Sequence, residues 1–178
     1  MSKPLKSYLT KNTVIMGIFC AIVAMIWPYT PFLQYQWLVF IMLPFFYLTS
    51  TEIKQIPGVV CCTFAGILWG VADLALCNFM ASINCHPFLI SIIGIGAVTT
   101  IACYVHMVLL ASTFLNKTGV ILAVFGITCH LGAQEPIAMA INFSAGGILC
   151  LACVFFTNLW QAPPAAETEE VEQVKKSA

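Results

Sequence analysis

Long apolar stretches alternate with short polar gaps along most of this chain. A helix that spans a bilayer needs about 20 apolar residues, within a range of about 17 to 25. The alternation predicts an all-α integral membrane protein with six transmembrane helices. Their apolar stretches cover residues 13–27, 35–49, 58–80, 88–115, 118–131 and 137–160.

The second and fifth stretches are the shortest, and Pro44 interrupts the second. At 1.5 Å per residue they reach only about 22 Å, which is short of the roughly 30 Å hydrocarbon core. Each is the middle helix of a set of three, and three crossings per half give the halves opposite orientations. Paired short segments at matching positions are typical of inverted-repeat transporters. The sequence therefore predicts two inverted three-helix repeats, with shortening by central packing as the alternative.

Composition supports the membrane class, because 61% of the residues are hydrophobic and only 8% are charged. A soluble domain would be about a quarter charged. The net charge is zero, so the chain lacks the basic face that nucleic-acid binding requires. The basic residues before the first stretch resemble the start of a secretory signal. Residues 28–31 (Pro-Tyr-Thr-Pro) offer no small-residue cleavage site, so we expect a retained first helix.

The basic residues set the orientation of the chain, which has no arginine. Cytoplasmic loops are rich in Lys and Arg. Six crossings with both termini in the cytoplasm place every lysine on the cytoplasmic side: Lys3, Lys6, Lys11, Lys54, Lys117, Lys175 and Lys176. The chain then divides into a cytoplasmic N-terminus (residues 1–12), a transmembrane domain (13–160) and an acidic, flexible cytoplasmic tail (161–178).

Asp73 is a charged residue deep inside an apolar stretch. A carboxylate at such a depth is costly and usually faces a cavity or a partner. Trp69 lies four residues earlier on the same helical face, and Asn78 five residues later is partly aligned. An acid beside an indole suits a small cation through charge and cation–π attraction. The acid could instead carry a proton, or form a structural hydrogen bond to a neighbouring helix.

Polar residues also gather where the fifth stretch breaks. Gly132 suits the end of one helix, and Pro136 the first turn of the next. The functional interpretation is an external vestibule that continues into the membrane and is formed by His130, Gln134, Glu135, Asn142 and Ser144. The alternative for Glu135 is a favourable position at the N-terminus of the sixth helix.

His106 lies in the cytoplasmic half of the fourth stretch, near Tyr104. Imidazole titrates near neutrality, so His106 could relay a proton or contact substrate. The alternative is a hydrogen-bonded packing histidine.

Most of the nine cysteines lie inside apolar stretches, where free Cys packs as a small hydrophobe. Cys150 and Cys153 form a CxxC, a spacing used in thiol chemistry and metal binding. An external thiol pair for exchange with a client is missing, and the cysteine and histidine candidates lie at different depths. We therefore expect no catalytic residue, no metal site and no cofactor.

Gly66 and Gly70 form a G-x-x-x-G pattern that indicates close helix packing, within or between protomers. Gly66 also begins a Gly-x-x-Trp that follows small residues and ends at Trp69. Residues 119–134 form a short Gly-aromatic-Gly-small helix with a polar break, and Gly146-Gly147 follows in the last helix.

These two patterns and the six-stretch layout resemble a family of small bacterial inner-membrane proteins catalogued as domain-of-unknown-function (DUF) 1097. The resemblance covers roughly residues 13 to 160. It departs from the family at Thr118-Gly119, where a Pro-Gly is common. The family implies a multi-pass location in the bacterial inner membrane and no established activity.

The sequence favours a non-enzymatic function in the lipid bilayer. Phosphate-binding loops are missing, and without arginine strong bidentate binding of anions is not expected. We predict a homo-oligomeric channel or transporter for a small polar solute, neutral or weakly cationic, of the amide or amine type. A membrane scaffold or accessory subunit that recruits a partner through its tail is the alternative. A membrane thiol oxidoreductase is the third possibility.

Overall fold

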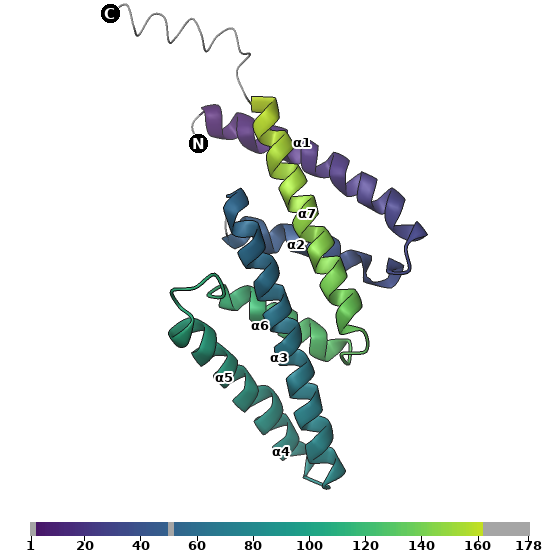
Figure 1. Ribbon diagram of the computed structural model, residues 1–178, viewed down its shortest axis with the longest axis vertical. Helices are drawn as coiled ribbons and strands as arrows, with labels where there is room; N and C mark the ends of the chain where they lie inside the picture. Colours follow the sequence, from purple (N-terminus) through teal and green to yellow (C-terminus); the bar gives the residue numbers. More distant parts are fainter. Residues whose placement is uncertain (1–2, 50–51, 162–178) are drawn as a thin grey trace, which may run out of the picture.

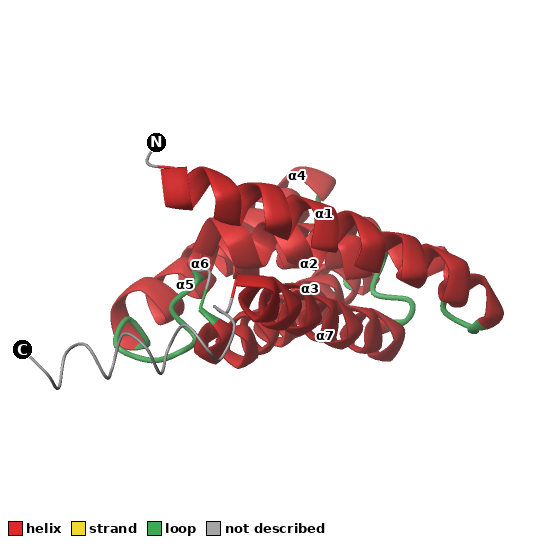
Figure 2. Ribbon diagram, turned by 90° about the horizontal axis from the view of Figure 1, so that it is seen from above, coloured by secondary structure: helices red, strands yellow, loops and turns green. Residues whose placement is uncertain are grey.

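The computed structural model describes residues 3–49 and 52–161. Within this part of the chain every regular element is helical, and no strand is present (Figure 2). The all-α prediction is therefore confirmed for the described residues. The acidic tail, predicted for residues 161–178, lies outside them beyond Gln161.

Six helical segments follow the predicted order (Figure 1). The fourth is continuous from Pro87 to Leu109 but changes its winding along the way, with α4 (Pro87–Ser91), α5 (Thr99–Tyr104) and two π-helical segments, η4 (Ile92–Val98) and η5 (Val105–Leu109). It ends before the predicted Leu115, because residues 110–117 form turns and a loop. The other five are α1 (Lys3–Ile26), α2 (Gln36–Thr49), α3 (Ile56–Ser82), α6 (Thr118–His130) and α7 (Pro136–Gln161).

Four of these segments are long and apolar enough to cross a membrane: Lys11–Tyr29, Ile53–Ser82, Pro87–Leu109 and Pro136–Trp160. The other two, α2 and α6, have 14 and 13 residues, so the prediction of two short middle helices is confirmed. Many large apolar side chains face outward, including Leu68 and Ile148, which are 69% and 68% exposed. These features are those of a membrane protein, because a soluble protein rarely exposes so much contiguous apolar surface.

Prolines and glycines set several helix ends. Pro57, Pro87 and Pro136 lie in the first turns of α3, α4 and α7, where a missing N–H costs no helical hydrogen bond. After α6 the chain turns through Gly132 (φ +65°) and Ala133 (φ +48°). Gly132 thus ends the fifth helix in the left-handed conformation that glycine adopts at helix C-termini.

In space the helices form two groups (Figure 1). The α7 group contains α7, α1 and α2, and the α3 group contains α3, the Pro87–Leu109 helix and α6. Each of the two long central helices therefore packs mainly against helices from the other half of the chain. α3 has its most extensive contact with α6, and α7 with α2. The two groups meet where α3 and α7 cross.

The middle helices of the two halves correspond position by position. α6 begins at Thr118, which is 82 residues after the start of α2 at Gln36. The five buried residues of α2 are Leu38, Val39, Met42, Leu43 and Phe46. The same spacing of 82 leads to the five buried residues of α6, which are Val120, Ile121, Val124, Phe125 and Thr128.

The third helices correspond in the same way with a spacing of 80 residues, since α3 begins at Ile56 and α7 at Pro136. Eight buried positions of α3 are Gly58, Val59, Cys62, Thr63, Gly66, Ile67, Gly70 and Asp73. Their counterparts are all buried in α7: Ala138, Met139, Asn142, Phe143, Gly146, Gly147, Cys150 and Cys153.

Glycines allow the same close approach in both groups. A Cβ on Gly66 of α3 would lie 2.6 Å from Ile121 O and 2.7 Å from Val124 Cβ on α6. A Cβ on Gly146 of α7 would lie 2.7 Å from Val39 O and 2.5 Å from Met42 Cβ on α2. Val39 and Met42 are the counterparts of Ile121 and Val124, so the two contacts are equivalent. The G-x-x-x-G pattern thus packs within the protomer.

Corresponding helices run in opposite directions. In Figure 1 the chain descends along α3 and ascends along α7, and α1 and the Pro87–Leu109 helix are likewise opposed. Contacts agree for the central pair, because Gly147 of α7 lies against Val60 and Ile56 near the start of α3. The start of α7 instead lies beside Phe64 and Ile67, further along α3.

Candidate functional site

Asp73 lies at the centre of the α3 group, where its side chain is 2% exposed. Both carboxyl oxygens face thiols. Cys129 Sγ on α6 donates to Asp73 Oδ2 at 3.4 Å, and Cys77 Sγ, one turn along α3, donates to Oδ1 at 3.8 Å. Thiols are weak hydrogen-bond donors. The carboxyl is therefore held between two helices by neutral partners.

Gly94 completes this arrangement, which we call the Asp73 centre (Asp73, Cys77, Gly94 and Cys129). Gly94 belongs to η4, and a Cβ on it would lie 2.5 Å from Cys77 Sγ and 3.0 Å from Asp73 Oδ1. A larger residue at this position would force the Cys77 and Asp73 side chains to shift. π-helical segments occur frequently at functional sites. The site thus combines a buried acid, two thiols and an irregular helix.

A second buried polar cluster lies in the α7 group. Asn12 Oδ1 on α1 accepts hydrogen bonds from Tyr47 Oη (3.0 Å) and from Thr157 Oγ1 (3.1 Å). Thr157 Oγ1 also lies 2.6 Å from the carbonyl oxygen of Cys153. Asn12 and Thr157 are 7% and 0% exposed. We call this cluster the Asn12 centre (Asn12, Tyr47, Cys153 and Thr157).

The two centres occupy corresponding places in the α3 group and the α7 group. Cys153 and Thr157 of α7 lie 80 residues after Asp73 and Cys77 of α3. Tyr47 and Asn12 lie 82 residues before Cys129 and Gly94, which is the spacing of the middle helices. Each centre therefore joins the first, middle and third helices of its group.

Trp69 does not share the site of Asp73, although both lie on α3. Its Nε1 donates to His106 Nε2 at 3.0 Å, and His106 Nδ1 lies 2.9 Å from Leu115 O. Because Nε2 accepts from the indole, the imidazole proton is on Nδ1 and is donated to that carbonyl. His106 is 3% exposed, and both of its ring nitrogens have partners. Trp69 and His106 are thus joined by a hydrogen bond between α3 and η5, and among the described residues no hydrogen bond joins the indole to Asp73.

Asn142 also ties helices together. Its Oδ1 accepts from Trp27 Nε1 at 3.0 Å, and its Nδ2 donates to Ala138 O at 2.7 Å. The residue is 0% exposed. Asn142 thus joins α7 to the segment that follows α1.

The other predicted site residues lie on the exposed surface. Asn78, His130, Gln134 and Glu135 are exposed, and Glu135 Oε1 accepts from Gln34 Nε2 at 3.3 Å. His130 follows Cys129 directly, yet its own side chain takes no part in the contacts of the Asp73 centre. The site residues predicted from the sequence therefore do not form one site but lie at several separate places in the structure.

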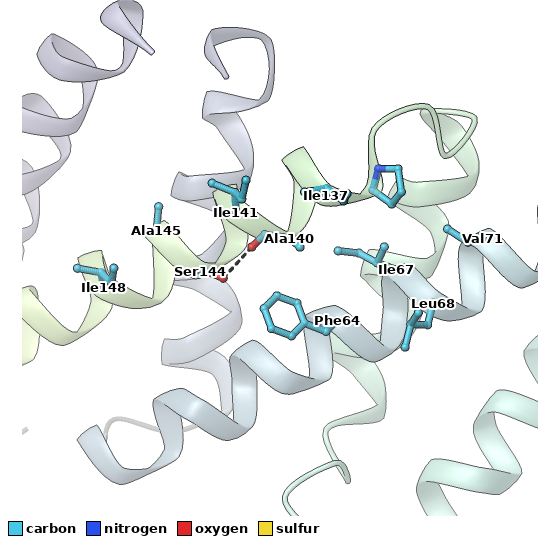
Figure 3. A pocket seen from close by; sticks show the side chains of 11 residues that line it. Phe64, Ile67, Leu68, Val71, Ile137, Ala140, Ile141, Ser144, Ala145 and Ile148 are labelled. Atoms are coloured by element: carbon cyan, nitrogen blue, oxygen red, sulfur yellow. Dashed lines mark hydrogen bonds between the residues drawn. The ribbon is translucent and has the colours of Figure 1, made fainter. Parts of the chain in front are cut away.

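A groove of about 740 Å³ follows the crossing of α3 and α7 (Figure 3). Its walls are mostly apolar and come from α3, which contributes Phe64 and Ile67, and from α7, which contributes Ile137 and Ile141. Its side-chain hydroxyl, on Ser144, donates to Ala140 O at 2.8 Å. The groove has no free polar group with which to select a polar solute.

A smaller groove of about 340 Å³ continues along the same crossing past Ser144 and Ile148. Each residue that lines it is the counterpart, at a spacing of 80, of a residue that lines the larger groove: Ile56, Pro57, Val60, Cys61, Ser144, Gly147, Ile148 and Leu151. The correspondence of the halves thus extends from the buried core to the apolar outer surface.

The described residues contain no group of three or more His, Cys, Asp or Glu side chains arranged to hold a metal ion. All nine cysteines lie in the described part and are free thiols. Cys150 and Cys153 are fully buried, and Cys150 Sγ donates to Met42 O at 3.7 Å. That thiol pair therefore has no exposed face on which to meet a client protein.

Comparisons with known proteins found no match: no family model, no curated protein and no solved structure matches the chain. The resemblance to the DUF1097 family stays a prediction.

Proposed function

We propose that the chain crosses a bacterial inner membrane six times, with both termini in the cytoplasm and residues 13–160 arranged as two inverted three-helix repeats. Three observations support this. The gaps that hold Lys54 and Lys117 alternate with lysine-free gaps. Four helices have the length and composition to span. Corresponding helices of the two halves are antiparallel and share their buried positions.

The lysines themselves provide the topology test. A membrane-impermeant amine reagent is applied to inside-out and to right-side-out vesicles, and labelling of Lys54 and Lys117 is measured by peptide mass spectrometry. We expect both to react in inside-out vesicles only. Labelling of one from each side would contradict the even number of crossings between them.

We further propose that the protein is a homo-oligomeric channel or transporter for a small polar solute, neutral or weakly cationic, of the amide or amine type. The observation that carries this proposal is the Asp73 centre. An ionisable residue inside a helix that can span a membrane is expensive, and such residues mark solute and ion pathways. The π-helical segment against the carboxyl adds a second mark of a functional site.

The burial of Asp73 determines how a solute would reach it. Because its side chain is 2% exposed, a solute reaches it only when α6 or η4 moves away from α3. The weak thiol contacts of Cys77 and Cys129 are the interactions that such an opening would break. A solute with an N–H group could replace them as a stronger donor to the carboxyl.

Flux into proteoliposomes tests the proposal, with urea, formamide, glycerol, methylamine and choline at two pH values. We expect selective uptake of one solute, and its loss in Asp73→Asn. Glu52→Gln is the matched control, since it neutralises an exposed carboxyl outside the candidate site residues and should retain flux. Folded, oriented protein that passes no solute would refute transport. Deleting residues 163–178 and measuring the loss of a binding partner would then test the recruiting alternative.

A further inference from the structure

We propose that Asp73 is a proton-binding site, which takes up and releases one proton as the protein works. This inference rests on the proposed transport function and names its coupling ion. The proton moves between an Asp73 carboxyl oxygen and water that enters when the site opens, so the carboxyl alternates between the neutral acid and the carboxylate.

The first argument is the lack of charge compensation. An isolated carboxylate is very costly in an apolar interior unless a cation or strong donors accompany it. The groups that face Asp73 are Cys77 on its own helix, Cys129 on α6 and Gly94 on η4. None is cationic. A carboxylate in the closed site therefore has no cationic partner among these groups, and water reaches it only when the site opens.

The second argument comes from the counterpart site. If the fold required a carboxyl at this place in each group, the α7 group would need one too. Its counterpart of Asp73 is Cys153, which is 0% exposed and packs without a charge. Asn12, Tyr47 and Thr157 connect the three helices there through neutral hydrogen bonds. The charge of Asp73 is thus not a packing requirement of this architecture.

The third argument is the close approach of the Gly94 backbone to the Asp73 carboxyl. Gly94 brings η4 against the carboxyl at a point where any side chain would collide with Cys77 Sγ. A small movement of this π-helical segment changes the space around one carboxyl oxygen directly. The site therefore has a structural element beside it that can control access of water to the proton.

Infrared difference spectroscopy of the full-length protein in lipid membranes tests the inference. The readout is the carboxylic acid C=O stretch, compared between the native protein and Asp73→Asn to isolate the signal of Asp73 from the glutamates. We expect an acid band that disappears as the pH is raised and that shifts in D₂O because the proton exchanges. Asp73→Cys copies the residue of the counterpart site and should fold yet lack the band.

Two outcomes would overturn the inference. One is a band that persists unchanged at every pH and in D₂O, which would mean a static structural acid. The other is the lack of any difference from Asp73→Asn, which would mean a permanent carboxylate. The result is separate from that of the flux assay: a titrating band without flux would refute transport alone, and selective flux without a titrating band would refute proton binding alone. Asp73→Cys keeps the test decisive if Asp73→Asn does not fold.

Discussion

The Asp73 centre and the Asn12 centre occupy the same place in the α3 group and the α7 group but contain different chemistry. One has a carboxyl, two thiols and a glycine, and the other an amide, a phenol and a hydroxyl beside a buried thiol. Both connect three helices at buried positions. We conclude from this comparison that the fold requires small or polar groups at these sites. It does not determine whether they are charged, so a charge there can serve a function.

The strongest test of this difference between the two centres is to place a carboxyl in the Asn12 centre. Cys153→Asp should destabilise the protein by about 2.5–3.5 kcal/mol, the insertion cost of an acid at the middle of a membrane helix. The Asn12 centre has no glycine or thiol pair arranged to receive it. Thermal unfolding in detergent, followed by size-exclusion chromatography, measures the change. Cys153→Ser is the size-matched control and should be much milder, and equal stability of the two variants would contradict the comparison.

Substitutions at the glycines test whether the helix contacts of the α3 group and the α7 group are equivalent. Gly66→Ala and Gly146→Ala should each cost about 1–3 kcal/mol, because the new methyl group meets backbone oxygen and Cβ atoms of the facing helix. Gly126→Ala in α6 meets nothing within 4 Å and should be neutral or stabilising by about 0.5–1 kcal/mol. The same unfolding assay compares all three. A large loss in only one group would show that the helix contacts are not equivalent.

The smallest expected effect tests the hydrogen bonds of the Asn12 centre. Tyr47→Phe removes the hydroxyl that donates to Asn12 and should cost about 0.6 kcal/mol and no more than about 1.7 kcal/mol, the average and the maximum found for such bonds in a membrane protein. Tyr29→Phe is the control, since Tyr29 is 90% exposed. Melting temperatures of the two variants should therefore separate. If they coincide, the Asn12 centre contributes no measurable stability.

The helices were predictable from the sequence because apolar length is a local property. The two short middle helices and the turn at Gly132 follow from the same kind of signal. The fourth helix ends earlier than predicted, because residues 110–115 are apolar enough to continue it yet form turns. Hydropathy does not distinguish an apolar turn from an apolar helix.

The site was less predictable, because its partners come from other helices. Asp73 could be selected as a buried charge, but its thiol partners look like packing residues in a sequence that is rich in apolar cysteines. Trp69 shares a helical face with Asp73, yet the neighbouring helix presents His106 to it. Asn12 lies at the edge of the first apolar stretch and gave no signal there.

The correspondence of the halves is also hidden from residue identity. The five pairs of buried residues in α2 and α6 contain no identical pair. Among the eight pairs in α3 and α7, only Gly66 and Gly146 are identical. What recurs is the spacing of burial and one obligatory close approach, and both become visible only when the helices are placed in space.

The brevity of α2 and α6 has a consequence for the surrounding lipid. Helices of 14 and 13 residues extend about 20 Å, whereas a typical hydrocarbon core is about 30 Å thick. Such hydrophobic mismatch is accommodated by local thinning of the bilayer at a modest cost per ångström. If both middle helices cross the membrane, as the proposed topology requires, the bilayer is thinned beside each of them and lipids with shorter acyl chains fit better than longer ones.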